Sequence, residues 1–206
     1  MRKEGIRSTG IVDPKHVGVI GFSYTCFLVL YALTHQSDLF AAASITDGNN
    51  KSYLQYLFDV DIGGRGNQFL EPLEETYGSR PYGRGLVDWA HNAPGFNLDK
   101  VKTPLLISSL ERGSLLGQWE IYAGLRAWQK PVEMMWVPSQ RVIPHVLVKP
   151  QDRYLSQQSA VDWFRFWLQG YEYPDPVKAD QYIRWRDLRK LQEENEKKPA
   201  TESVPH

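Results

Sequence analysis

This sequence has a single cysteine, no excess of charge of either sign and no long apolar run. A single cysteine, Cys26, excludes an intrachain disulfide and any zinc site built from several cysteine thiolates. The 24 basic and 24 acidic residues balance and form no basic stripe, so we expect no nucleic acid partner. No run approaches the roughly 18 apolar residues of a membrane-spanning helix, and residues 1–10 lack the apolar core of a signal peptide.

What is present suits a domain that acts on a peptide or another small molecule. The 206 residues are enough for one domain with a sizeable core. Neither His-Glu-x-x-His nor a comparable spacing of metal ligands occurs, so we expect no metal and no other cofactor.

The segment from Val17 to Thr25 predicts a nucleophile elbow. Its apolar run breaks at Gly21 and delivers Ser23 just before a helical pattern. In such an elbow the serine occupies a sharp strand-to-helix turn, and glycines two residues before and after it let the crowded backbone pass. The first glycine is present as Gly21, but Thr25 stands at the second position. Ser23 is therefore a candidate nucleophile, and the alternative is an ordinary polar residue in a turn.

The order of the expected elements predicts a parallel sheet with helical crossovers. Short apolar runs bounded by turn residues predict strands at 17–20, 40–45, 104–108 and 132–137. Helical spacing predicts helices at 24–35, 116–129, 154–169 and 178–198. Between the second and third strands lies a long insert, residues 49–102, which is rich in glycine and aromatics and contains only short helical patches such as 71–77.

Several motifs in this order resemble the catalytic domain of the prolyl oligopeptidase family of serine peptidases. The matching pieces are Val12 to Ser23, Phe40 to Ala43, Lys102 to Ile107, Lys130 to Glu133, and a late His145 followed by Asp162 to Phe164. The threonine-ending elbow and the stretch from Asp162 to Glu172 are similar to a bacterial branch that includes lasso-peptide isopeptidases. The resemblance implies an α/β-hydrolase fold and serine-type hydrolysis of peptide or related acyl bonds, with an N-terminal β-propeller that usually gates the site.

On this resemblance the chain corresponds to part of an α/β-hydrolase. Residues 1–173 match the C-terminal half of the catalytic domain, with the last four parallel strands of the sheet, flanking helices and the insert. Residues 174–206 are a charged helix followed by a frayed tail. The elbow strand then has one bare edge, which we expect the upstream half of the domain, with or without a propeller, or a partner chain to cover.

The order of residues along an α/β-hydrolase selects the catalytic base. A serine hydroxyl needs a histidine to take its proton, and the triad arrives in the order serine, acid, histidine. His145 alone follows the fourth strand on a loop before the closing helix, so we expect it to be the base. The remaining histidines precede the elbow, end a helix, lie in the insert or end the chain: His16, His35, His91 and His206.

The acid and the oxyanion donor follow less directly. The family expects an aspartate shortly after the third strand, where this chain has Glu111 as the nearest carboxylate, so Glu111 is the predicted acid. Glu120 in the next helix and Asp47 at the end of the second strand are alternatives, since some α/β-hydrolases draw the acid from that strand. The backbone N–H of Tyr24, directly after the nucleophile, is the expected oxyanion donor.

The predicted function is hydrolysis of peptide or isopeptide bonds through an acyl-enzyme, and we expect the chain to be a piece of a longer peptidase. One alternative is an esterase of the same fold acting on small acyl substrates. Another is a catalytically inactive domain retained for binding, which the departures from the family pattern would suit: Thr25, Ser108, Ser109 and Glu111. The resemblance favours a periplasmic or secreted enzyme, while the given sequence shows no targeting signal.

Overall fold

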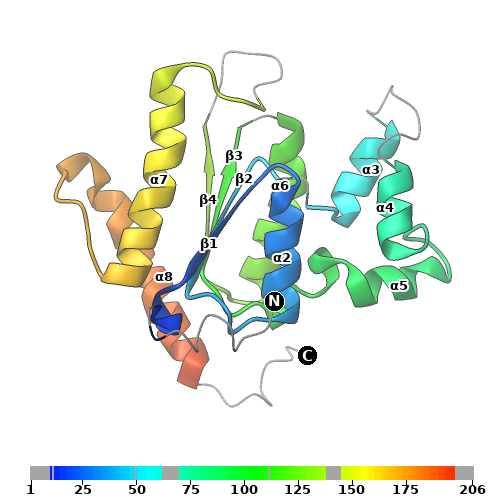
Figure 1. Ribbon diagram of the computed structural model, residues 1–206, viewed down its shortest axis with the longest axis horizontal. Helices are drawn as coiled ribbons and strands as arrows, with labels where there is room; N and C mark the ends of the chain where they lie inside the picture. The colour runs from blue at the N-terminus through cyan, green and yellow to red at the C-terminus, as the bar shows by residue number, and fades with distance from the viewer. Residues whose placement is uncertain are drawn as a thin grey trace.

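The computed structural model describes residues 10, 12–48, 50–61, 70–110, 112–137 and 145–197. Its centre is a four-stranded parallel sheet in the order β1-β2-β3-β4 (Figure 1). The strands are β1 (Gly18–Phe22), β2 (Ala42–Thr46), β3 (Leu105–Ser109) and β4 (Val132–Trp136). Each observed strand overlaps its predicted range, and the predicted parallel α/β arrangement is confirmed.

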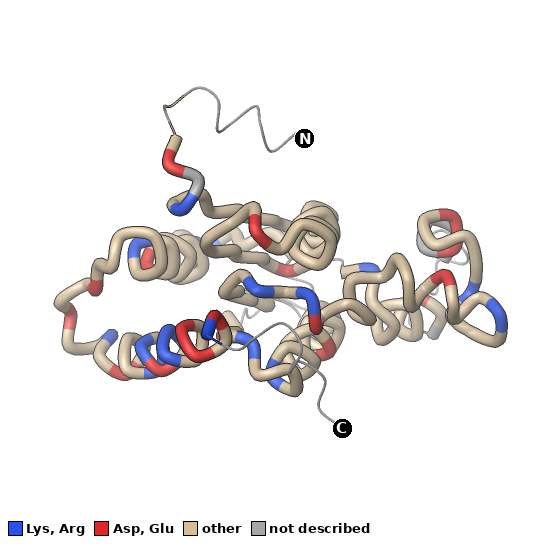
Figure 2. Tube along the Cα trace, turned by 90° about the horizontal axis from the view of Figure 1, so that it is seen from below, with Lys and Arg blue, Asp and Glu red and all other residues tan. Residues whose placement is uncertain are grey.

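Helices cover both faces of the sheet (Figure 1). On one side lie α2 (Thr25–His35) and α6 (Arg112–Ala127), and on the other lie α7 (Pro150–Gln169) and α8 (Ala179–Lys197). Short 3₁₀ turns precede β1 and α8, namely η1 (Pro14–His16) and η5 (Pro176–Lys178). Acidic and basic residues are mixed along α8, as Figure 2 shows.

The two faces are packed with different side chains. Between the sheet and α2 and α6 the core is mainly aliphatic, with Leu30, Ile45, Ile107 and Ile121 fully buried. Between the sheet and α7 and α8 it is aromatic, and it contains Trp163, Phe166, Tyr182 and Trp185. We call this second cluster the aromatic layer.

Glycine serves two positions around these layers, a close approach at Gly18 and a left-handed turn at Gly170. A Cβ at Gly18 would lie 2.6 Å from Cε1 of Phe164, so α7 packs against the bare backbone of β1. Helix α7 ends at Gly170, whose φ of 67° is left-handed, as the sequence predicts for this stop.

The described residues of the insert form three helices, two 3₁₀ turns and no strand. These elements are α3 (Tyr53–Asp61), α4 (Leu70–Tyr77), α5 (Gly85–Asn92), η3 (Pro94–Phe96) and η4 (Leu98–Lys100). Helices α3 to α5 stand out to one side, beyond α2 and α6 (Figure 1). They are held by a small core in which Tyr56, Tyr77 and Trp89 pack with Phe27 of α2. The insert is therefore joined to the helix that follows the elbow.

Strand β1 forms an open edge of the described sheet. It pairs with β2 alone among the described strands. Ile20, at the centre of this strand, leaves 62% of its surface exposed. An apolar side chain exposed in mid-strand beside unpaired backbone groups is a surface that another strand or chain can cover.

Candidate active site

Ser23 occupies a strained turn between β1 and α2. Its φ of 53° is left-handed, which is uncommon for a residue with a Cβ. Gly21 makes the turn possible, because a Cβ there would lie 3.0 Å from both the Thr25 carbonyl oxygen and Cγ2 of Val29. The strand-to-helix turn predicted from the sequence is therefore present, with Ser23 at its tip.

Thr25 has a clear role in the position where the elbow motif has its second glycine. Its hydroxyl accepts a hydrogen bond from the Phe22 N–H and donates one to the Phe22 carbonyl oxygen, each 2.7 Å long. The side chain thus closes the turn that carries Ser23. Thr25 begins helix α2, so its position does not require the conformational freedom of glycine.

The sheet register places Asp47 beside Ser23. Phe22 and Thr46 are paired at the carboxyl ends of β1 and β2, so the next residue of each strand emerges at the same edge. The Ser23 N–H donates to the Thr46 carbonyl oxygen at 3.1 Å, and the Asp47 N–H donates to the Ser108 carbonyl oxygen at 2.7 Å. Asp47 also has a left-handed φ, 49°.

His145 lies between these two side chains. Its Nε2 is 2.9 Å from the Ser23 hydroxyl oxygen, and its Nδ1 is 2.5 Å from Oδ2 of Asp47. The Asp47 side chain is fully buried, whereas that of His145 is 39% exposed. The ring of Phe22 stacks on the imidazole with centroids 5.0 Å apart. A proton on Nδ1 leaves Nε2 free to accept the Ser23 hydroxyl proton, which is the arrangement of a serine hydrolase.

Hydrogen bonds with Leu110, Ser114 and Gln118 hold Asp47 in place. Its Oδ1 accepts hydrogen bonds from the Leu110 N–H at 3.0 Å and from the Ser114 hydroxyl. With its amide oxygen turned toward the strand end, the buried Gln118 accepts from the N–H groups of Asp47 and Gly48 at 3.1 and 2.6 Å. The Asp47 carboxylate therefore remains fixed as a hydrogen-bond acceptor for His145.

Close packing beneath this loop leaves no room for a side chain at residue 48. A Cβ at Gly48 would lie 2.6 Å from the Cβ of Cys26 and 2.9 Å from its Sγ. Cys26 is fully buried, and burial raises the pKa of its thiol to about 12. Its role is packing under the loop of Asp47.

The other acid candidates from the sequence have different positions. Glu120 accepts hydrogen bonds from the N–H groups of Tyr53 and Leu54 at 3.2 and 2.6 Å, so it caps the first turn of α3. Glu111 lies outside the described residues, directly after Leu110. Asp47, which the sequence indicates only as an alternative acid, is the carboxylate that contacts His145. The signal for it was available, since Asp47 follows a buried strand adjacent to the elbow strand.

The described residues show neither a metal site nor a membrane span. No group of three or more His, Cys, Asp or Glu side chains in this part of the chain is arranged to hold a metal ion. No described helix is both long enough and apolar enough to cross a bilayer.

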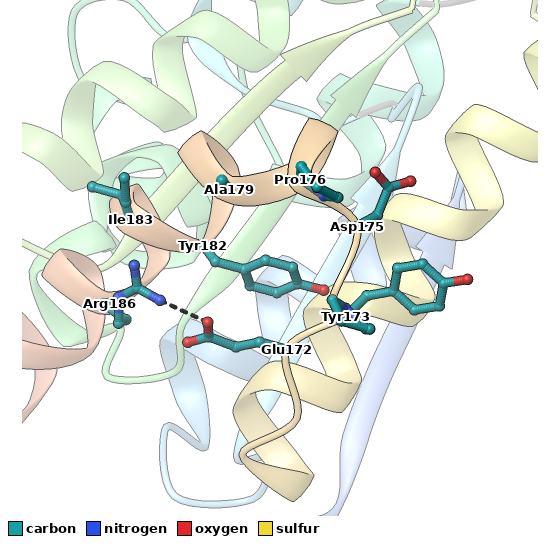
Figure 3. Close-up of a pocket in the computed structure, with 9 residues that line it drawn as sticks. Glu172, Tyr173, Asp175, Pro176, Ala179, Tyr182, Ile183 and Arg186 are labelled. Atoms are coloured by element: carbon teal, nitrogen blue, oxygen red, sulfur yellow. Dashed lines mark hydrogen bonds and ion pairs between the residues drawn. The ribbon is translucent and has the colours of Figure 1, made fainter.

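A hollow of about 230 Å³ lies at the connection between α7 and α8 (Figure 3). Glu172 and Arg186 form an ion pair of 2.6 Å at its wall. The Tyr182 ring lies next to Glu172, and its hydroxyl points toward Tyr173. The 20 residues of α7, about 30 Å of helix, separate this hollow from the segment that carries His145. It is therefore not part of the arrangement around Ser23.

Comparisons with known proteins match this chain and its fold. The model of the prolyl oligopeptidase family matches residues 4–171. The lasso peptide isopeptidase AtxE2 of Asticcacaulis excentricus is 32% identical over 198 residues, which are 95% of this chain and 26% of that relative. The apo structure of the AtxE2 isopeptidase superposes with a TM-score of 0.73 at 30% identity, covering 92% of this chain and 27% of that one.

More distant structures share the fold. The acylaminoacyl peptidase of Pyrococcus horikoshii has a TM-score of 0.64 at 22% identity, over 86% of this chain and 28% of its own. The chain thus spans about a quarter of the length of the relatives that it matches. Its four parallel strands are part of an α/β-hydrolase sheet, as predicted. The chain belongs to the prolyl oligopeptidase family.

Proposed function

We propose that this chain carries the catalytic triad of a serine peptidase or isopeptidase, with Ser23 as nucleophile, His145 as base and Asp47 as acid. The observation that carries the proposal is the position of His145, within hydrogen-bond distance of the Ser23 hydroxyl on one side and the Asp47 carboxylate on the other. The strained elbow under Ser23 supports the same function, because backbone strain of this kind clusters at active sites.

The chemistry follows from these contacts. As Ser23 Oγ attacks the acyl carbon, His145 Nε2 takes the hydroxyl proton, and Asp47 stabilises the imidazolium through Nδ1. The negative charge that develops on the acyl oxygen is met by the Tyr24 backbone N–H. His145 then gives its proton to the leaving amine as the C–N bond breaks. Water, deprotonated by His145, releases the acyl group from Ser23 by the reverse sequence.

The acid assignment separates Asp47 from Glu111. Asp47 is supported by its 2.5 Å contact with Nδ1, its burial and its hydrogen bonds to Leu110 and Ser114. Glu111 stays a prediction from the family pattern. The variants D47N and E111Q remove one negative charge each with little change in size, so they form a matched pair.

The substrate that the similarity favours is a peptide, and among peptides one closed by an isopeptide bond. The AtxE2 relative is named a lasso peptide isopeptidase, and a serine-to-alanine variant of it has been solved with Astexin3-dC4 bound. The esterase alternative would use the same triad on small acyl groups. An inactive binding domain is disfavoured by the hydrogen-bonded Ser23 and His145 and by Thr25, which closes the elbow.

We further propose that the open edge of β1 is covered in the working enzyme. The exposed Ile20 and the relatives' remaining three quarters of length support a covering partner from the upstream half of a hydrolase domain, with or without a β-propeller, or from a separate chain. A periplasmic or secreted location is part of the same proposal, and fractionation of the source cells tests it.

A fluorophosphonate probe tests the central claim, because it reacts with an activated serine. The complete gene product that carries this chain should be labelled, and S23A should abolish labelling without lowering the unfolding midpoint. S159A is the matched control, since the Ser159 hydroxyl only bonds back to the Leu155 carbonyl on α7. Equal labelling of wild type and S23A, or no labelling of the wild type, would refute a live triad.

A further inference from the structure

A buried lysine lies beside the elbow without any part in the triad. Lys51 follows β2 with a left-handed φ of 47° and is only 3% exposed. Its ammonium nitrogen lies 5.0 Å from the ring centroid of Tyr24 and 4.8 Å from that of Phe27. A charged group withdrawn from water is costly unless it has partners, and cation–π contacts of this kind gain strength when they are desolvated.

The same residue is tied to the insert at both its ends. The Lys51 ammonium donates to the Thr76 hydroxyl at 2.5 Å, and the Tyr77 hydroxyl donates to the Lys51 carbonyl oxygen at 2.9 Å. Thr76 and Tyr77 are the last residues of α4. Lys51 therefore connects the last turn of α4 with the residue that follows the nucleophile.

We propose that Lys51 is a positioning residue for the oxyanion-binding peptide of the elbow. Tyr24 precedes the first turn of α2 and is half exposed. The Lys51 ammonium and the Phe27 ring contact its ring. By fixing this ring, the ammonium restricts rotation of the Ser23–Tyr24 peptide, whose N–H must point at the developing oxyanion. The inference rests on the proposed function and extends it to a residue of the insert.

A merely structural role for Lys51 predicts different behaviour. A structural role predicts that K51M lowers the unfolding midpoint, because its buried partners lose their contacts, while kcat of the folded protein stays unchanged. A positioning role predicts that kcat falls while KM stays within twofold, because the N–H contact strengthens in the transition state.

The experiment measures steady-state hydrolysis of p-nitrophenyl acetate by the complete gene product. We expect K51M to lower kcat about tenfold, less than the roughly 10²–10³-fold lost when an oxyanion donor is removed. K51R should restore part of the loss, because a guanidinium also binds an aromatic face. K102M is the matched control, since Lys102 is an exposed lysine paired only with Asp38 at the surface.

A double-mutant cycle tests the route through the ring. If Lys51 acts through Tyr24, then K51M and Y24L should together cost about as much as either alone. Multiplied effects, or a kcat for K51M within twofold of the wild type, would overturn the proposal. If K51M does not fold, T76V removes the hydroxyl that anchors the ammonium and should lower kcat in the same direction. Hydrolysis that persists in S23A would instead reject the proposed function itself.

Discussion

The carboxyl ends of the strands and the aromatic layer under α7 and α8 differ in backbone conformation and in polarity. Four residues other than glycine have a left-handed φ in the described chain; Ser23 and Asp47 directly follow β1 and β2, and Lys51 lies five residues beyond β2. Within α7 and α8 no described residue has a left-handed φ, and α7 simply ends at Gly170. The strand ends thus combine strain with polar groups, and the aromatic layer is regular.

The aromatic layer contributes to stability through buried rings. Trp163 and Trp185 are almost fully buried, with ring centroids 5.1 Å apart in an edge-to-face arrangement. At the strand ends, by contrast, buried polar groups such as Asp47 and Gln118 are satisfied by hydrogen bonds. Changes in the first region should therefore lower stability, and changes in the second should lower activity. The following predictions test that division, from the largest effect to the smallest.

Replacing Asp47, the proposed acid, should give the largest effect on activity. D47N leaves the shape of the site but favours the wrong histidine tautomer, so we expect the acylation rate to fall about 10⁴-fold. The midpoint of thermal unfolding should change little by comparison. Stopped-flow reaction with a fluorophosphonate measures the rate, and E111Q is the matched variant. A large loss in E111Q with activity retained in D47N would return the acid to Glu111.

Truncating the aromatic layer should have the largest effect on stability. W163A leaves a cavity between α7, α8 and the sheet and should cost about 3–5 kcal/mol in the free energy of unfolding. The acylation rate of the protein that remains folded should stay near that of the wild type. Urea titration with active-site titration separates the two quantities. V177A serves as the control, because Val177 is 89% exposed.

Thr25 lies at the border between the two kinds of effect. T25A removes a hydroxyl that makes two hydrogen bonds to Phe22 and should cost about 1 kcal/mol of stability. Because the turn also orients Ser23, the acylation rate should fall several-fold, and T25S should restore both. A T25A protein with normal acylation would show that Gly21 and the strand pairing alone hold the elbow.

The smallest effect concerns Asp59 in the insert. Burial raises the pKa of its carboxyl to about 6 from an ordinary 3.8, so the folded state holds this proton more tightly than the unfolded state. The resulting contribution to stability is present at pH 3.8 and below and is lost as the pH rises through about 6. D59N should therefore raise the unfolding midpoint more at pH 7 than at pH 4. An equal change at both pH values would contradict the raised pKa.

The sequence predicted the sheet better than the helix starts. The apolar runs located all four strands because buried parallel strands are nearly continuous apolar segments. Helix α6 begins at Arg112 and α7 at Pro150, each four residues before the predicted start. Their first turns are polar, and proline at the start of α7 is compatible with a helix there, so apolar periodicity alone begins too late.

The site was predictable in part for a similar reason. Motif and chain order indicated Ser23 and His145, which the structure brings within 2.9 Å of each other. Motif spacing favours Glu111 over Asp47 as the acid, because it records distance along the chain. The contact with His145 depends instead on which strands are neighbours. Pairing of Phe22 with Thr46 is what places Asp47 next to Ser23. Lys51 had no motif at all, since its partners lie on the elbow and on α4.

The thiol of Cys26, packed beneath Gly48, can report how often the loop of Asp47 opens. Its sulfur is fully buried against the loop that holds Asp47, and a pKa of about 12 keeps it protonated and unreactive while the loop is closed. A thiol reagent can reach it only when the loop and α2 separate. Cys26 is the single thiol of this chain, so the rate of its modification in the native protein measures how often the loop of Asp47 opens.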